Sequence, residues 1–451
     1  MKLVGIKTLA SITLAALAAC VAHPAGEREE RDRALEVGKQ FDEQLAPPAL
    51  PDNPSAEDYL HTAFFANAEL QQRYWEWRSA LERIPQDASP PNAALTFGYL
   101  FGDGQMKAWD RTTLGITNDP MTNVPLPSKL AVAGRRALEE ARAAGLRFEA
   151  AKFRLQAEVL KTYYDLALHS ELLRTQEAML RVLEVAQASA SAGTATGGST
   201  AVDLVRAGTE LELARNDLAN LHSQLPPLAA RMNALIGRPP DAKVPLPNEL
   251  PEPRPLSASD EEIVHFAAQR SPELAALDRD IAGREEALEL ARKARLPDFN
   301  LSFSITGTIS QMLGGMLVLP TRTEAIDAGI EQARDDLRAA QAARTQYSRD
   351  LTASFVLDLY VLRNAERQVA LFREVIVPRA ELLGQTSLSS LAPGRGRLVD
   401  ALDSQRMLLD SRLTLATMRI EREKALTAIE TWTELDVEAL HPMAAGTAAV
   451  R

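Results

Sequence analysis

Two aspartates have the residue type and the spacing to form a local patch of negative charge. Asp400 and Asp403 stand three residues apart in a stretch of helical periodicity, which puts both carboxylates on one helix face, one turn apart. Asp203 matches Asp400 in an earlier copy of that stretch, 197 residues upstream. Confined carboxylates attract cations and repel one another. The alternative is a solvated first helical turn, where the helix dipole favours Asp, and the sequence leaves both readings open.

The single cysteine, Cys20, ends the tetrad Leu17-Ala18-Ala19-Cys20. The apolar run before it, residues 9–19, is too short to span a bilayer but suits an export signal. The tetrad resembles the bacterial lipobox, which implies cleavage before Cys20 and attachment of a diacylglycerol to its thiol. By the same resemblance, Val21 in place of Asp implies sorting to the outer membrane. The alternative is a small buried cysteine after an ordinary signal peptide.

The sequence carries no signature of catalysis or of a resident cofactor. It has no phosphate-binding loop, no pair of cysteines and no HExxH motif, and its six histidines lack ligand spacing. His61 and His265 occupy matched repeat positions, where a structural role is the simpler interpretation. A formal charge of -11 gives little support to a nucleic-acid groove. We expect no enzyme activity, no cofactor, no metal site and no nucleic-acid partner.

The chain consists of two tandem copies of one long unit. Residues 199–221 match 396–418 at an offset of 197, and residues 124–129 match 317–322 at an offset of 193. Such self-similarity indicates a repeated architecture. The expected organisation is a signal peptide (1–19), a lipidated N-terminal tether (20–56), a first repeat (57–237), a linker (238–257), a second repeat (258–436) and a disordered tail (437–451).

Each copy is expected to hold a helix, a strand pair, a very long helix, a turn and a heptad helix. Strict alternation of apolar and polar residues predicts strands at 95–101 and 299–306. Gly314-Gly315 is expected to turn the second strand back. The expected helices are 57–82, 128–190 and 258–295, then 322–390 with an interruption at Pro378.

Two further expectations concern proline. The segment 20–56 is first charged and then proline-rich, which is typical of an extended tether. Pro226-Pro227 fall within a seam of apolar residues seven apart, where they should break or sharply kink the helix.

This order of elements behind a lipobox resembles the TolC-like outer-membrane efflux proteins, over about residues 57–436. It is especially similar to the lipoprotein branch that serves tripartite pumps of the resistance-nodulation-division class. The resemblance implies a mainly α fold with a small β part. Three protomers would each give four strands to one 12-stranded transmembrane β-barrel and their helices to a long α-helical barrel. The strand pattern itself also favours a closed barrel. Two strand pairs leave unpaired backbone groups at their edges, and in lipid only strands from other copies could pair with them.

The resemblance also implies a function and partners. The homotrimer would lie in the outer membrane, lipid-anchored, with most of the chain in the periplasm. It would be a passive exit duct working with a periplasmic adaptor protein and an inner-membrane transporter. The stretch Val399-Asp400-Ala401-Leu402-Asp403-Ser404 matches a family segment that narrows the periplasmic end. By that match Asp400 and Asp403 form the pore constriction, with Asp203 as their first-repeat counterpart.

Two other classes remain open on the sequence. A periplasmic coiled-coil adaptor would show its helical hairpin once, between lipoyl and barrel segments. A purely structural coiled-coil lipoprotein would have no need for the alternation of residues 299–306.

Overall fold

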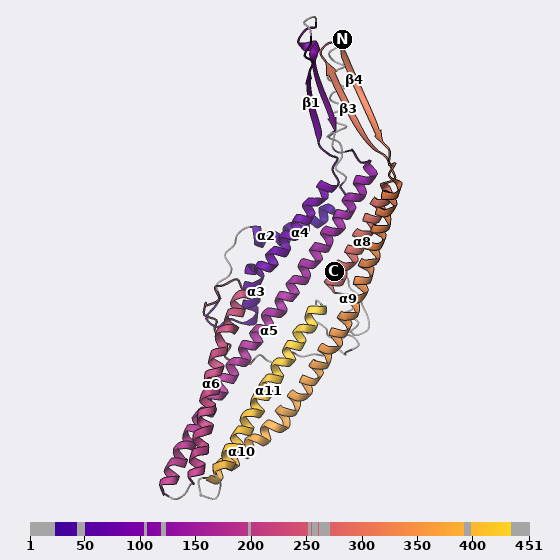
Figure 1. Cartoon of the computed structure of the whole chain (residues 1–451). Helices are drawn as coiled ribbons and strands as arrows, with labels where there is room; N and C mark the ends of the chain where they lie inside the picture. Colours follow the sequence, from indigo (N-terminus) through magenta and orange to yellow (C-terminus); the bar gives the residue numbers. More distant parts are fainter. Residues whose placement is uncertain are drawn as a thin grey trace. The chain divides into compact units, whose positions relative to one another are not determined.

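A computed structural model describes residues 23–42, 50–102, 106–118, 123–196, 200–250, 254, 260, 271–391 and 398–433. The described chain is mainly helical with one four-stranded sheet (Figure 1), which confirms the expected fold class. It divides into two compact units, and each takes segments from both repeats. The sheet-bearing unit comprises the described residues of 1–39, 73–148 and 273–347, and the hairpin unit those of 40–72, 149–272 and 348–451.

The elements alternate long helices with short strand pairs. In chain order they are α2 (Glu27–Asp42), α3 (Ala56–Ala66), α4 (Ala68–Asp87), β1 (Ala93–Tyr99), η1 (Trp109–Arg111), β2 (Thr112–Asn118), α5 (Pro127–Thr196), α6 (Ala201–Leu235), α8 (Pro272–Lys293), β3 (Asp298–Thr306), β4 (Ser310–Val318), α9 (Thr323–Leu371), η2 (Phe372–Ile376), α10 (Val377–Leu391) and α11 (Leu398–Thr433). Within the described ranges, no helix combines the length and the hydropathy needed to cross a lipid bilayer.

The strands form one antiparallel sheet in the order β1-β2-β3-β4. The hairpins of the two repeats are joined through β2 and β3, where Thr113 lies opposite Thr306 with their hydroxyl oxygens 2.9 Å apart. In the described chain, β1 and β4 are therefore the two edges of the sheet. Paired residues of antiparallel strands point to the same face, so this register decides what each face carries.

One face of the sheet is apolar across all four strands. Leu95, Ile116, Phe303 and Leu313 are successive register partners. The same face carries Phe97, Leu114, Leu301, Ile305 and Leu317. Leu95 and Phe97 are 76% and 70% exposed, so no described residue of this chain covers them.

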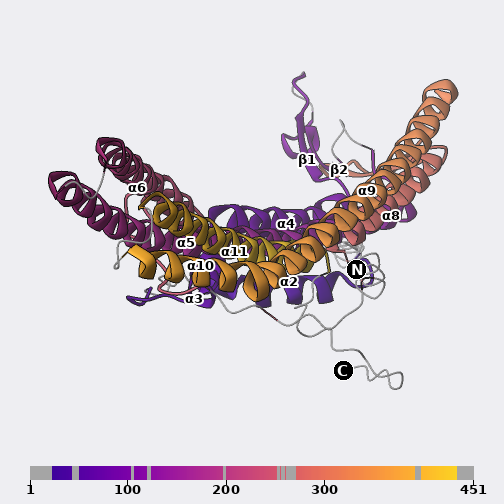
Figure 2. The same ribbon diagram turned by 90° about the horizontal axis from the view of Figure 1, so that it is seen from below.

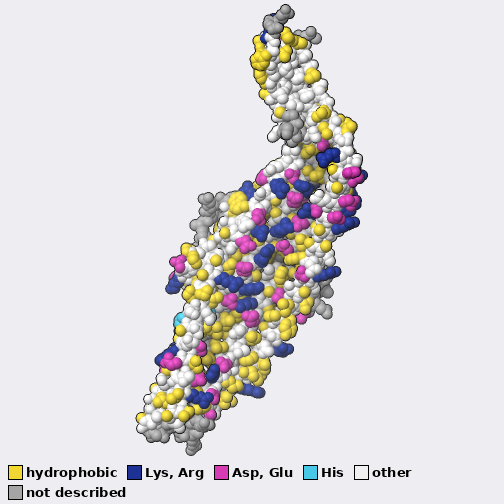
Figure 3. Space-filling view, viewed as in Figure 1, with side chains coloured by type: hydrophobic (Ala, Val, Ile, Leu, Met, Phe, Trp, Pro, Cys, Tyr) yellow, Lys and Arg dark blue, Asp and Glu magenta, His cyan; other side chains and the backbone are white. Residues whose placement is uncertain are grey.

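The opposite face is small and mostly polar. It carries Thr96, Thr113, Thr117, Asn300, Ser302, Ser304 and Thr306, with Gly115 and Gly314 between them. Its apolar exceptions are Ala94 of β1 and Met312, Met316 and Val318 of edge strand β4. Asp298 is the single charged residue in the four strands, and its Oδ1 accepts a 2.7 Å ion pair from Lys129 Nζ. In Figure 3, charged side chains gather over the helices and are sparse over the sheet.

The turn between β3 and β4 lies earlier than Gly314-Gly315, so that prediction is wrong. Both glycines lie inside β4, and the turn is formed by residues 307–309, where Gly307 has a φ of +46°. Asp110 holds this turn by accepting hydrogen bonds from the backbone N–H and hydroxyl of Thr308, at 2.8 and 2.6 Å. Gly314 instead allows close pairing, because a Cβ there would lie 2.6 Å from Ser302 Oγ.

An extended conformation throughout residues 20–56 is also a wrong prediction, because Glu27–Asp42 form helix α2. Two of its charged residues, Glu30 and Arg31, bond to helix α4, whereas others such as Arg28 and Asp32 face water. The Trp77 indole donates to Glu30 Oε1 at 3.1 Å, and Arg31 donates to the Leu81 carbonyl at 2.9 Å. Trp77 is fully buried and stacks on Phe148. Charge density was therefore a poor indicator of an extended chain here.

Prolines interrupt the helices less than expected. The helix α6 continues through Pro226 and Pro227, so the expected break is absent. Pro378 has a local effect instead. It leaves the Glu374 carbonyl without its usual donor, and the π-turn η2 ends two residues before it. The first expected helix is divided at Asn67, whose side-chain amide donates to the Leu235 carbonyl at 3.0 Å.

Candidate functional site

The matched aspartates lie at the starts of two helices in the hairpin unit. The end of α5 pairs with α6, and α10 pairs with α11 (Figures 1 and 2). Leu402 of α11 packs into a cluster with Leu183 and Ala186 of α5 and with Leu211 and Ala214 of α6. The two hairpins are thus in direct apolar contact close to these helix starts.

Asp203 is engaged by the start of its own helix. Its Oδ2 accepts hydrogen bonds from the Thr200 backbone N–H at 3.0 Å and from the Thr200 hydroxyl at 2.7 Å. The Thr200 Oγ1 in turn accepts from the Asp203 backbone N–H, which completes a capping box. The helix-start interpretation therefore accounts for this carboxylate.

Asp400 holds the same third position in α11 but has different surroundings. Residue 397, the counterpart of Thr200, is an arginine and lies outside the described residues. Asp400 and Asp403 are exposed, and neither forms an ion pair with another described residue. Ala401, Leu402 and Ser404 turn inward, at 2%, 8% and 4% exposure. The two carboxylates thus share an open face opposite the packed one.

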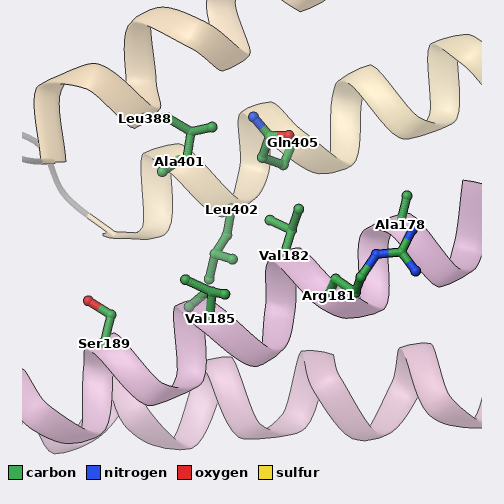
Figure 4. A pocket seen from close by; sticks show the side chains of 10 residues that line it. Ala178, Arg181, Val182, Val185, Ser189, Leu388, Ala401, Leu402 and Gln405 are labelled. Carbon is green, nitrogen blue, oxygen red and sulfur yellow. The ribbon is translucent and has the colours of Figure 1, made fainter.

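A pocket of about 500 Å³ separates α5 from the α10–α11 hairpin near these aspartates (Figure 4). Its walls are mostly apolar. They comprise Ala178, Arg181, Val182, Val185, Ala186 and Ser189 from α5, Leu388 from α10, and Ala401, Leu402 and Gln405 from α11. The start of α11 is therefore loosely packed on this side.

The other end of α11 is held by a buried ionic cluster. Arg254 of the linker donates to Glu423 Oε2 at 3.0 Å and to Glu430 Oε1 at 2.5 Å, and these glutamates are 3% and 4% exposed. Arg422 adds bonds to Glu423 and to the Arg254 carbonyl, both at 2.6 Å. Burial alone would lower the pKa of Arg254, but the carboxylates of Glu430 and Glu423 raise it above its ordinary value.

The sequence does not predict this cluster directly, but it holds one signal of a buried charge. The heptad positions Ala401, Leu408 and Leu415 continue to Arg422, so an arginine occupies a core position of the seam. Arg422 is 8% exposed. A buried arginine requires acidic partners, and Glu423 and Glu430 lie on the same helix.

Several residues and segments with a predicted role lie in parts of the chain that the structure does not describe. Cys20, His265, the signal peptide 1–19 and the tail 437–451 lie outside the described residues. His61 is exposed, with its ring 5.5 Å from that of Phe65. In the described ranges, no group of three or more His, Cys, Asp or Glu side chains is arranged to hold a metal ion.

The fold described above is that of the TolC-like outer-membrane channels. The outer-membrane channel OprN superposes with a TM-score of 0.68 at 17% identity, over 88% of this chain and 91% of that one. CusC gives 0.68 at 15% identity over 86% and 95%, and CmeC of Campylobacter jejuni gives 0.70 at 13% over 84% and 85%. No protein-family model matches the sequence, and a search of curated proteins gives no match. The similarity lies in the structure and confirms the fold that the resemblance of the sequence implies.

Proposed function

We propose that this chain is the outer-membrane channel of a tripartite efflux pump, a passive exit duct from the periplasm to the exterior. The observation that carries the proposal is the sheet. Its apolar face is continuous across four strands and exposed, its other face is mostly polar, and both edges are unpaired in the described chain. Lipid accepts no unpaired strand edge, so β4 of one copy must pair with β1 of the next.

Closure with other copies gives a homotrimer with twelve strands. The apolar face then meets lipid and the row of Thr, Ser and Asn lines water. The structural likeness to OprN, CusC and CmeC supports this assembly. A structural coiled-coil lipoprotein would not need such a sheet, and an adaptor would not repeat the hairpin with its strand pair.

The finer parts of the proposal rest on the resemblance of the sequence to lipidated efflux proteins. Cys20 anchors the N-terminus to the outer membrane through its acyl chains, and most of the chain lies in the periplasm. A periplasmic adaptor and an inner-membrane transporter deliver the cargo to the channel, and the cargo consists of small molecules or metal ions. Asp400 and Asp403 of three copies narrow the periplasmic end, with Asp203 fixing the start of α6 beside them.

A pair of adjacent substitutions on β1 tests the architecture. Phe97→Asp puts a charge on the apolar face, whereas Thr96→Asp puts the same charge on the opposite face. We expect the first variant to be lost from the outer-membrane fraction and the second to assemble as wild type, since charge on the lipid face destabilises a barrel. Native mass spectrometry of the wild type should show three copies. A soluble monomer, or equal behaviour of the two variants, would reject the proposal.

A further inference from the structure

The pocket between α5 and the α10–α11 hairpin has no part in the proposed conduit, yet it has the size and lining of a ligand site. Its volume of about 500 Å³ falls within the range of small-molecule pockets, roughly 300–1,000 Å³. Figure 4 shows Val182, Val185 and Leu402 directed into the space between the helices. These side chains offer an apolar surface to the body of a ligand.

The lining of this pocket carries positive charge and no negative charge. Arg181 is the single charged residue among the ten that line it, and no carboxylate accompanies it. Arg181 forms no ion pair with any other residue of the described chain. Glu184, the acidic residue three positions further on, pairs with Arg215 on α6 at 3.5 Å. A guanidinium beside an apolar surface favours a ligand with an anionic head.

We propose that this pocket binds a small organic anion with an apolar body, such as an aromatic carboxylate. The carboxylate accepts hydrogen bonds from Arg181, and the ring system lies among Val182, Val185 and Leu402. The apolar contacts supply burial, and the charge-assisted bonds select an acid over a neutral analogue.

Binding has a mechanical consequence, because the ligand contacts α5 and α11 together. An occupant that touches both helices stabilises the arrangement in which they stay close, and it shifts the population toward that state. Since Asp400 lies in the first turn of α11, the ligand holds the periplasmic end in the arrangement described here. This consequence rests on the proposed channel function, whereas the binding itself does not.

Binding can be measured on the full-length protein in nanodiscs of phosphatidylcholine. The probe is 2-naphthoate, with 2-naphthalenemethanol as the neutral analogue, and the readout is isothermal titration calorimetry. Arg181→Gln removes the charge and Arg181→Lys keeps it. Val185→Trp fills the pocket, and Val205→Trp on α6 is its matched control, because the two valines are 71% and 69% exposed and Val205 does not line the pocket.

We expect saturable binding of 2-naphthoate, weakened about ten-fold or more by Arg181→Gln and by Val185→Trp. Val205→Trp should bind as wild type, Arg181→Lys should retain most of the affinity, and the neutral analogue should be insensitive to Arg181→Gln. Equal affinity in all variants would show partition into lipid or another site and overturn the proposal. Absence of saturable binding would overturn it as well, including the case in which a neighbouring copy fills the pocket. A failure here with normal membrane assembly leaves the channel function standing.

Discussion

The indole Nε1 of Trp432 donates a 2.9 Å hydrogen bond to Oδ2 of Asp358, which joins the end of α11 to α9. Asp165 matches Asp358 in the first repeat, and its Oδ1 instead pairs with Lys424 Nζ at 2.6 Å. Burial raises the pKa of the Asp358 carboxyl, and the hydrogen bond from Trp432 opposes this only in part. The equivalent positions of the two repeats thus make different contacts, and both contacts are with α11.

The raised pKa of Asp358 predicts that Asp358→Asn stabilises the protein at neutral pH. The folded state holds the ionised carboxylate less well than the unfolded state, whereas Asn keeps an acceptor for Trp432 without the charge. The advantage of the variant should shrink as the pH falls through the raised pKa of folded Asp358. It should be lost below the ordinary value of 3.8, where both states of the wild type are protonated. Thermal unfolding midpoints across pH measure this. Asp335→Asn, an exposed position on α9, is the control, and a less stable Asp358→Asn at neutral pH would contradict the prediction.

Arg254→Met should destabilise the protein strongly. It removes the Arg254 guanidinium from the buried carboxylates of Glu423 and Glu430, although Glu423 keeps its bond to Arg422. Removing one side of a buried pair costs about 3–5 kcal/mol. Arg338→Met breaks an exposed pair with Asp335 and should cost less than about 1 kcal/mol. Denaturant unfolding of the two variants gives the comparison. Adding Glu423→Gln and Glu430→Gln to Arg254→Met should recover part of the loss, and equal stability of the two single variants would show that the cluster is not critical.

Asp400→Ala with Asp403→Ala should remove cation preference from the channel. Six carboxylates of a trimer confined at one end attract cations, and multivalent cations should block the wild-type pore from the periplasmic side. Protonation at low pH should weaken both effects, and Ala preserves the helix. Single-channel recordings in planar bilayers decide this, with Asp410→Ala, an exposed position further along α11, as the control. Unchanged selectivity and block in the double variant would leave these aspartates as a solvated helix start.

Cys20→Ser should abolish lipidation. Metabolic labelling with a tagged fatty acid should mark the wild-type protein and leave the variant unmarked, because no other thiol exists in the chain. Equal labelling of both proteins would show that the tetrad is not a lipid-attachment signal.

The repeat pattern predicted the architecture because it constrains residues far apart at once. Alternation at 299–306 located β3 to within one residue at its start and correctly at Thr306. The structural role of a glycine pair was harder to predict, however. Gly314-Gly315 have the composition of a turn, but they serve close pairing within β4, which only the partner Ser302 reveals.

The sequence likewise predicted only part of the candidate site, because contacts between distant segments are not visible in local patterns. Spacing placed Asp203 and Asp400 at equivalent helix starts, and the structure agrees, at the third residue of α6 and of α11. The pocket and the Arg254 cluster depend on which helices meet, and local sequence does not state this. Arg422 in the heptad seam was the one local signal of a buried charge.

The pairing of β2 with β3 has a kinetic consequence. Thr113 and Thr306 are 193 residues apart, so the hydrogen bonds that unite the two hairpins have a very long loop to close. The sheet cannot be completed until the β3–β4 hairpin has been made and exported, and until then β2 presents an open edge. Formation of the four-stranded sheet is therefore a late step in the life of the chain, and the unpaired first hairpin is the segment most exposed to misassociation on the way.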